Sequence, residues 1–261
     1  MADSPAAGGL VARAANRQLG KSDREAAGVL SSAQRHTHFL DSPRIVASTA
    51  ASDFAFADLK ERIGTVFLVL PPDRLDTYAR WLRLLIAQAI TDMARSPAKP
   101  ARPVLFLLDE FAALGRLEPV ERAMGLMAGY GMQLWPILQD MHQLRATYGE
   151  RAGTFMSNAG VIQAFGVNDH ATADMLSCTL GDTTIEYTTF SSSRPASMFS
   201  DGARSQSASG HVAARRLATP DEIMRMPPDS LLLLRQGEHP LVIGKIRYYD
   251  QREFAGLFDP V

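Results

Sequence analysis

The chain has 261 residues, of which 46% are hydrophobic and 21% are charged, and its formal net charge is -1. These values allow one sizeable α/β domain or one and a half smaller domains, and they exclude wholesale disorder. A net charge near zero also excludes a global attraction to nucleic acid, so any DNA contact would need a local cluster of Arg and Lys.

Membrane and disulfide signals are weak. The longest apolar runs, 65–70 and 104–108, are far shorter than the roughly 20 residues that a membrane helix needs. The first residues lack the basic and apolar regions of a signal peptide. Cys178 is the only cysteine, which excludes an intrachain disulfide and fits a reducing compartment. We therefore expect a chain that is soluble by itself.

The N-terminal part predicts helices and one strand. Residues 1–40 are Ala-rich and predict helices, one of which begins near Ser22-Asp23. After a break at Asp41-Ser42-Pro43, the run 65–70 predicts a buried strand because it is rich in β-forming residues and closed by Pro71-Pro72. A long helix follows, and its apolar face is formed at helical spacing by Leu75, Tyr78, Ala79, Leu82, Ile86, Ala89 and Met93.

The middle of the chain alternates strands with helices. Strands are predicted at 104–108, 132–138 and 161–165, and helices at 117–128, 140–158 and 171–180. This alternation is typical of βα units, so we predict an α/β fold with a mostly parallel sheet and flanking helices.

The composition changes after residue 190. Residues 191–210 contain eight serines and little that could be buried, so we predict a flexible Ser-rich loop over 191–217. Structure resumes at Thr219-Pro220, an N-cap followed by Pro at the first helical position. Two strands, 231–234 and 241–246, are predicted to close the chain.

Asp109 and Glu110 are the first candidate site residues. They directly follow the apolar run 104–108, and an apolar strand that ends in two carboxylates is the Walker B pattern of P-loop NTPases. A buried strand holds such carboxylates rigidly at its carboxyl end, where doubly wound folds bind ligands. On this interpretation Asp109 binds Mg²⁺ through water, and Glu110 orients or deprotonates the attacking water. The alternative is that Asp109 caps the following turn and Glu110 is only solvated.

Gln139 is the third candidate. It follows the strand predicted at 132–138, and neighbouring parallel strands end at the same edge of a sheet, so we expect it beside Asp109 and Glu110. A neutral amide there can sense the γ-phosphate or hold the attacking water. Alternatively, Gln139 is an N-cap or turn residue, and Pro136 argues for an irregular or edge strand.

The combined motifs resemble the TraG-type coupling proteins, P-loop ATPases that bring DNA or protein substrates to a type IV secretion channel in conjugation. The resemblance spans roughly residues 15–250, and the segments that carry it are 106–111, 138–144, 148–149 and 165–169. Residues 21–32 also look like the helical domain that is inserted in that family's motor.

The resemblance implies a RecA-like fold that is incomplete at its N-terminal side and carries part of an all-helical inserted domain. It assigns residues 1–42 to the inserted domain and 43–190 to the motor core with Walker B. The Ser-rich loop then occupies 191–217, and residues 218–261 supply a helix and strands that complete the core.

The same resemblance implies the cofactors and the partners. ATP and Mg²⁺ are the expected cofactors, with Asp109 and Glu110 as the Walker B pair and Gln139 as the phosphate-sensing glutamine. The complete protein is expected to be a homo-hexamer at the cytoplasmic face of the bacterial inner membrane. Its expected partners are DNA, a relaxase and components of the type IV secretion channel.

Two departures from the family pattern stand out. Gly20-Lys21-Ser22 looks like the end of a Walker A loop, but the glycine required five residues before Gly20 is Ala15, and no apolar strand precedes it. We therefore expect the true phosphate loop to precede Met1 and this chain to be inactive alone. The position of the family's arginine finger holds Ala128, and the conceivable substitutes are Arg122, Arg145 and Arg151.

Three functions stay open at this point. The chain is the C-terminal portion of a conjugative coupling ATPase, a non-catalytic docking module or gene remnant, or a fragment of a related FtsK-like DNA translocase. The helical segment before residue 65 favours the first over the third. Elsewhere, His36 and His38 lack the further ligands of a metal site, and Cys178 is predicted to pack in an apolar helix.

Overall fold

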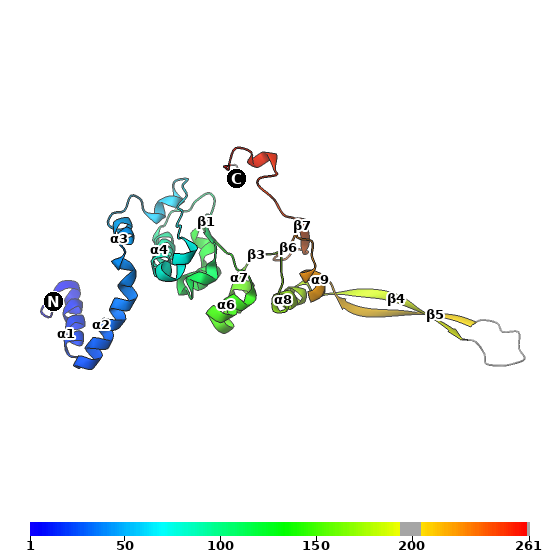
Figure 1. Ribbon diagram of the computed structural model, residues 1–261, viewed down its shortest axis with the longest axis horizontal. Coiled ribbons are helices and arrows are strands. Elements are labelled where there is room, and N and C mark those ends of the chain that lie inside the picture. The colour runs from blue at the N-terminus through cyan, green and yellow to red at the C-terminus, as the bar shows by residue number, and fades with distance from the viewer. Residues whose placement is uncertain (194–204, 260–261) are drawn as a thin grey trace, which may run out of the picture. The chain divides into compact units, whose positions relative to one another are not determined.

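In the computed structural model, residues 1–193 and 205–259 are described, and so are their side chains except at 127, 128, 192, 193 and 205–207. The chain divides into two compact units, Met1–Ile137 and Leu138–Val261, each of which has its own elements (Figure 1). The domain boundaries predicted at 42, 190 and 217 stay predictions. Among the described residues, no helix is both long and apolar enough to span a membrane.

The first unit begins with helices and ends in a strand pair (Figure 1). Its principal elements are α1 (Leu10–Leu19), α2 (Asp23–Thr37), α3 (Pro43–Thr49), α4 (Leu75–Arg95), β1 (Val104–Leu108), α5 (Glu118–Leu126) and β2 (Met132–Pro136). Helix α2 begins where it was predicted because Ser22 and Glu25 form a capping box, in which each side chain accepts the other residue's backbone N–H.

Helix α4 provides much of the core of this unit. Its buried residues are Leu82, Ile86, Ala89, Ile90 and Met93, which confirms the C-terminal two-thirds of the predicted apolar face. At its C-terminal end the Lys60 ammonium, whose residue is 6% exposed, donates to the carbonyl oxygens of Met93 at 2.6 Å and Ser96 at 3.0 Å. A buried cation thereby satisfies carbonyls that the end of the helix leaves unpaired.

Strands β1 and β2 form a parallel pair, as predicted, with Leu108 opposite Pro136 at their carboxyl ends. The prediction that β1 is buried is wrong for one face, because Leu105 and Leu107 are 50% and 56% exposed. The strand predicted at 65–70 is also absent, and Phe67 is 81% exposed. Its β-forming residues give the right local propensity, but none of the described strands pairs with it, and an isolated strand has no ladder to join.

The second unit contains short helices, a small sheet and a long hairpin (Figure 1). Its principal elements are α6 (Met141–Tyr148), α7 (Ala152–Asn158), β3 (Val161–Ala164), α8 (His170–Leu180), β4 (Asp182–Ser193), β5 (Ser205–Arg216), α9 (Pro220–Met224), β6 (Ser230–Arg235) and β7 (Leu241–Gly244). Helix α9 confirms the predicted cap, since the Thr219 side chain accepts the backbone N–H of Glu222.

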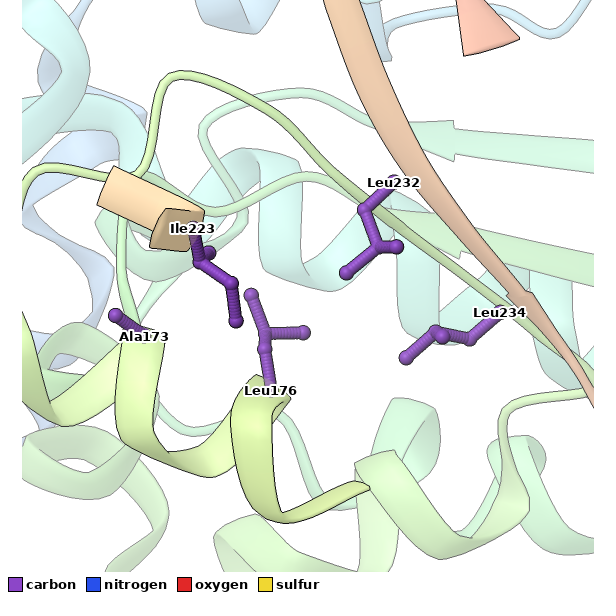
Figure 2. Packing of buried hydrophobic residues seen from close by; sticks show 5 residues of the cluster. All are labelled: Ala173, Leu176, Ile223, Leu232 and Leu234. Atoms are coloured by element: carbon purple, nitrogen blue, oxygen red, sulfur yellow. The ribbon is translucent and has the colours of Figure 1, made fainter. Parts of the chain in front are cut away.

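The sheet of the second unit corrects the predicted pairing. Strand β3 does not continue a parallel sheet but pairs antiparallel with β6, which pairs antiparallel with β7. Buried side chains from α8, α9 and β6 converge on one cluster beside this sheet, as Figure 2 shows for Ala173, Leu176, Ile223, Leu232 and Leu234. The apolar strand β6 therefore takes β3 as its partner on one side and β7 on the other, which the alternation of strands and helices did not predict.

The hairpin of β4 and β5 corrects the predicted Ser-rich loop. The two strands pair in continuous register from Asp182 opposite Arg216 to Ser193 opposite Ser205, while the remainder of the predicted loop, 194–204, lies outside the described residues. A ladder of backbone hydrogen bonds does not depend on side chains, so small polar residues can form it once β4 supplies a partner. The hairpin projects away from α8 and α9 as a long ribbon (Figure 1).

Arg216 anchors the hairpin to α8. Its Nη1 donates to Asp174 Oδ1 at 3.1 Å, to Ser177 Oγ at 3.2 Å and to Cys178 Sγ at 3.0 Å. Cys178 is exposed and contacts this guanidinium, so the prediction that it packs among apolar residues is wrong.

Candidate functional site

Asp109 and Glu110 follow the last residue of β1. The residues on either side of them, Leu108 and Phe111, both form backbone hydrogen bonds with Ile137. The N–H of Ile137 donates to the carbonyl of Leu108 at 3.0 Å, and the carbonyl of Ile137 accepts the N–H of Phe111 at 3.1 Å. Phe111 is fully buried, whereas Asp109 and Glu110 are exposed. Asp109 and Glu110 therefore form a short exposed turn after β1, called the excursion below, and a backbone hydrogen bond to Ile137 fixes each end of it.

The backbone of Glu110 has an unusual conformation. Its φ of 48° and ψ of 42° place it in the left-handed region, which residues other than glycine rarely adopt. The Asp109 carboxylate supports the turn, because its Oδ1 accepts the N–H of Glu110 at 3.1 Å. Strained conformations of this kind are concentrated at functional sites. Residue types and spacing do not reveal this torsion.

Gln139 lies just before the first turn of α6 and is exposed. Its backbone N–H donates to Oε1 of Gln143 at 3.3 Å, and its own Oε1 accepts a hydrogen bond from Nε2 of Gln143 at 3.2 Å. The alternative that Gln139 is the N-cap is wrong, because Asp140 is the N-cap and accepts the N–H of Gln143 at 2.8 Å. Gln143 was not predicted, although its spacing of four residues from Gln139 could have signalled the contact.

The first turn of α6 is held against the first turn of α8. The N–H of Met141 donates to Oγ1 of Thr172 at 3.1 Å, and Nε2 of His142 lies 3.5 Å from Oδ1 of Asp169. Asp169 also caps α8 by accepting the N–H of Thr172 at 2.8 Å. Partial burial raises the pKa of Asp169, but the hydrogen bonds from Thr172 and the charge of His142 outweigh burial and leave this pKa below its usual value.

The donor atoms at the end of β1 fit a Mg²⁺ ion that keeps most of its water. Carboxylate oxygens are preferred Mg²⁺ ligands, and this ion binds through one or two of them together with phosphate oxygens and water. Within the described ranges, no group of three or more His, Cys, Asp and Glu side chains could hold a metal ion by itself. Asp109 and Glu110 belong to the first unit and Gln139 to the second, so their meeting at one site stays a prediction.

Gly20-Lys21-Ser22 forms the turn between α1 and α2. The N–H of Gly20 donates to the carbonyl of Asn16 at 2.9 Å, and that of Lys21 donates to the carbonyl of Gln18 at 3.3 Å. The N–H of Ser22 donates to the Glu25 carboxylate at 3.2 Å. A phosphate cradle needs converging N–H groups that are free to donate, and these three are engaged within the helices.

Comparison with known proteins identifies the family of this chain. Residues 10–257 match the family described as "Type IV secretory system Conjugative DNA transfer". Over 220 residues the chain is 34% identical to Protein VirD4 of Rhizobium rhizogenes, an alignment that covers 83% of the chain and 32% of that protein. It is 31% identical over 232 residues to the conjugal transfer protein TraG of Escherichia coli, covering 83% of the chain and 36% of that protein. The chain thus spans about a third of the length of the curated relatives that it matches.

Solved structures show the same fold. The bacterial conjugative coupling protein TrwBdeltaN70, in a trigonal form with sulphate, matches with a TM-score of 0.67 at 19% identity, over 86% of this chain and 50% of that one. TrwB in complex with ADP and Mg²⁺ matches with a TM-score of 0.57 at 18% identity, over 74% of this chain and 43% of that one. From the span of the family match and the identity to its relatives, we conclude that the chain belongs to the conjugative DNA transfer family of type IV secretory systems.

Proposed function

We propose that this chain carries the Walker B part of the nucleotide-driven motor of a conjugative coupling protein. The observation that supports the proposal best is the fixed excursion after β1, which displays Asp109 and Glu110 at the carboxyl end of a parallel strand. The relative TrwB has been solved with ADP and Mg²⁺, which are the ligands that this pair of carboxylates would serve.

Each side chain takes one task in the proposed site. Bound Mg²⁺-ATP supplies the transferable phosphoryl group and the positive charge beside it. Asp109 would hold a metal-bound water through its carboxylate, and Glu110 would accept a proton from the attacking water. Gln139 would contact the nucleotide phosphates through its amide.

We further propose that the chain does not hydrolyse ATP alone. The amides of Gly20-Lys21-Ser22 are engaged in a turn between two helices, so the one sequence that looks like a phosphate loop cannot cradle phosphate. In this proposal residues 1–42 are part of an all-helical insert, and 43–190 are part of a RecA-like core. The whole protein would be a hexameric ring at the cytoplasmic face of the inner membrane that passes DNA and its relaxase to the secretion channel.

A mating assay tests the carboxylates in the protein's own setting. The chain is expressed in donor cells with its conjugative system, and transfer frequency is compared for the unchanged chain and for Asp109→Asn, Glu110→Gln and Glu118→Gln. Loss of a general base costs about a hundredfold or more, so Glu110→Gln should lower transfer by that factor. Asp109→Asn should also lower transfer, because it removes the carboxylate that holds the metal-bound water. Glu118 is exposed in α5 and serves as the matched control, with transfer unchanged. Full transfer by the Glu110→Gln variant would contradict the motor assignment.

A turnover assay tests the proposal that the chain does not hydrolyse ATP alone. The purified chain is mixed with Mg²⁺-ATP, and phosphate release is measured for the unchanged chain and for Glu110→Gln. We expect neither to release phosphate above the buffer rate. If the unchanged chain turns over ATP and Glu110→Gln abolishes this turnover, the chain binds ATP with its own residues. The proposal that the chain does not hydrolyse ATP alone would then be wrong.

A further inference from the structure

The side chain of Gln139 is held in one orientation by Gln143. Two hydrogen bonds join the residues, one from the backbone N–H of Gln139 to Oε1 of Gln143 and one from Nε2 of Gln143 to Oε1 of Gln139. Asp140 fixes the backbone between them, because its Oδ1 accepts the N–H of Gln143 at 2.8 Å.

The donors and acceptors in this pair allow one arrangement of the two amides. A backbone N–H can only donate, so the atom of Gln143 that faces it must be the amide oxygen. The NH₂ group of Gln143 is then the atom that faces the side chain of Gln139. Since an NH₂ group can only donate, it must meet the amide oxygen of Gln139. The NH₂ group of Gln139 is thereby turned away from Gln143.

This orientation assigns a task to the NH₂ group of Gln139. The Nε2 of Gln143 occupies one of the two lone pairs of the Gln139 amide oxygen and holds that oxygen toward Gln143. An NH₂ group is a donor, and a phosphate oxygen is an acceptor with negative charge. The free NH₂ group therefore suits a phosphate oxygen.

We infer that Gln143 is a positioning residue that locks the amide of Gln139 as a hydrogen-bond donor for a phosphate oxygen of the nucleotide. The inference rests on the proposed function for the identity of the phosphate, while the lock itself rests on the two hydrogen bonds. The proton of the attacking water would go to Glu110, because a carboxylate is a base and an amide is not.

The surrounding contacts keep the lock in place. The N–H of Met141 donates to Oγ1 of Thr172, and His142 lies beside Asp169, so the turn that contains Gln139 and Gln143 is attached to α8 by groups other than Gln143. Replacing the Gln143 side chain should therefore free the amide of Gln139 while the turn stays attached to α8.

One substitution reverses the lock. Gln143→Glu keeps an acceptor for the N–H of Gln139 but replaces the NH₂ donor with a second carboxylate oxygen. The amide of Gln139 then turns over, its NH₂ group donates to the introduced carboxylate and its oxygen faces outward. Ala146→Glu places the same charge at an exposed position of α6 and serves as the control for charge alone.

Nuclear magnetic resonance of the full chain, labelled with ¹⁵N in its glutamine side chains, measures the lock directly. We expect slow hydrogen exchange for the NH₂ group of Gln143 and rapid exchange for that of Gln139. Gln88 is the internal reference for an NH₂ group bound to a carboxylate, because its Nε2 donates to Asp92 Oδ1 at 2.7 Å. In the Gln143→Glu variant the NH₂ signal of Gln139 should become as protected as that of Gln88.

A titration then tests the ligand. Inorganic phosphate is the probe, and chloride at equal ionic strength is the reference. Phosphate should shift the NH₂ signal of Gln139, and Gln143→Glu should weaken this response by about fivefold, the value of one neutral hydrogen bond, relative to Ala146→Glu. A protected NH₂ group on Gln139 in the unchanged chain, or no shift with phosphate, would overturn the inference. The exchange measurement uses no nucleotide, so its failure is distinct from a failure of the Glu110 mating assay.

Discussion

The left-handed backbone of Glu110 leads to a stability prediction with an unusual sign. For an L-residue this conformation costs about 1–2 kcal/mol, whereas glycine adopts it freely. Glycine also makes the unfolded chain more flexible, which costs about 0.5–1 kcal/mol. Glu110 is exposed at φ 48°, so its side chain contributes little packing that glycine would lose. The Glu110→Gly variant should therefore be more stable than Glu110→Gln by about 0.5–1 kcal/mol.

Tryptophan fluorescence gives an assay confined to the relevant unit. The chain has two tryptophans, Trp81 and Trp135, and both lie in the unit Met1–Ile137 that contains Glu110. Urea unfolding followed by their emission reports the free energy of unfolding of this unit. Glu110→Gln is the reference because it removes the charge and keeps the Cβ, so the difference between the two variants isolates the backbone.

The comparison can fail in a clear way. If Glu110→Gly is equally or less stable than Glu110→Gln, the left-handed torsion carries no strain, and the claim that the turn holds Glu110 at a cost is wrong. If Glu110→Gly is the more stable variant, Glu110 lowers the stability of the chain. A loss of transfer in the Glu110→Gln mating assay would then connect this destabilising residue to function.

Three further predictions concern residues that stabilise the fold of the two units. Lys60→Met removes both hydrogen bonds at the C-terminal end of α4, so it should lower the free energy of unfolding seen by tryptophan fluorescence by about 2 kcal/mol. The exposed control Lys99→Met should change it by less than about 0.5 kcal/mol, and an equal loss in both variants would contradict the role of burial. Gly131→Ala should cost about 3 kcal/mol in the same assay, because its Cβ would lie 2.5 Å from Cδ of Pro100 and its φ is 73°. Asp169 has a lowered pKa, so its carboxylate stabilises the fold above the unfolded pKa of about 3.9, and this stability is lost as the pH falls through the folded pKa. Thermal unfolding by circular dichroism should therefore depend less on pH below about 5 in Asp169→Asn, and an unchanged acid dependence would rule out this carboxylate as its source.

Elements that are specified locally could be predicted from the sequence. The start of α2 depends on Ser22 and Glu25, and the start of α9 depends on Thr219 and Glu222, residues that are only three apart. The long helix α4 follows from the spacing of its apolar residues, which the sequence displays directly.

Elements that depend on distant partners could not be predicted from the sequence. The run 65–70 has the propensity of a strand but lacks a described neighbour, whereas β5 has a weak propensity and forms a full ladder with β4. The direction of β3 is decided by β6, some seventy residues later in the chain, as the pairing of Ile162 with Leu234 shows. Propensity describes a residue's own preference, but pairing is a property of two segments.

The candidate site also has features that the sequence predicts and features that depend on distant partners. Asp109, Glu110 and Gln139 could be selected because they follow the carboxyl ends of β1 and β2, Gln139 three residues after Pro136, and strand ends can be found from apolar runs. The torsion of Glu110 could not, since it arises from the two hydrogen bonds that Ile137 makes on either side of the excursion. Gln143 lies between these cases, because its spacing predicts a contact with Gln139 but not the orientation of the two amides.

The structure positions the carboxylates and the amide by different physical means, and this difference separates their responses to mutation. Backbone hydrogen bonds hold Asp109 and Glu110, so a change that moves them must also disturb the hydrogen bonds of Ile137 with Leu108 and Phe111 and lower the free energy of unfolding. Side-chain hydrogen bonds hold the amide of Gln139, and they lie at the surface, where their loss costs little. Gln143→Glu should therefore leave the free energy of unfolding within about 0.5 kcal/mol while it reverses the amide. A large loss of stability in that variant would show that Gln143 supports the fold of α6, and its effect on phosphate could then not be assigned to orientation.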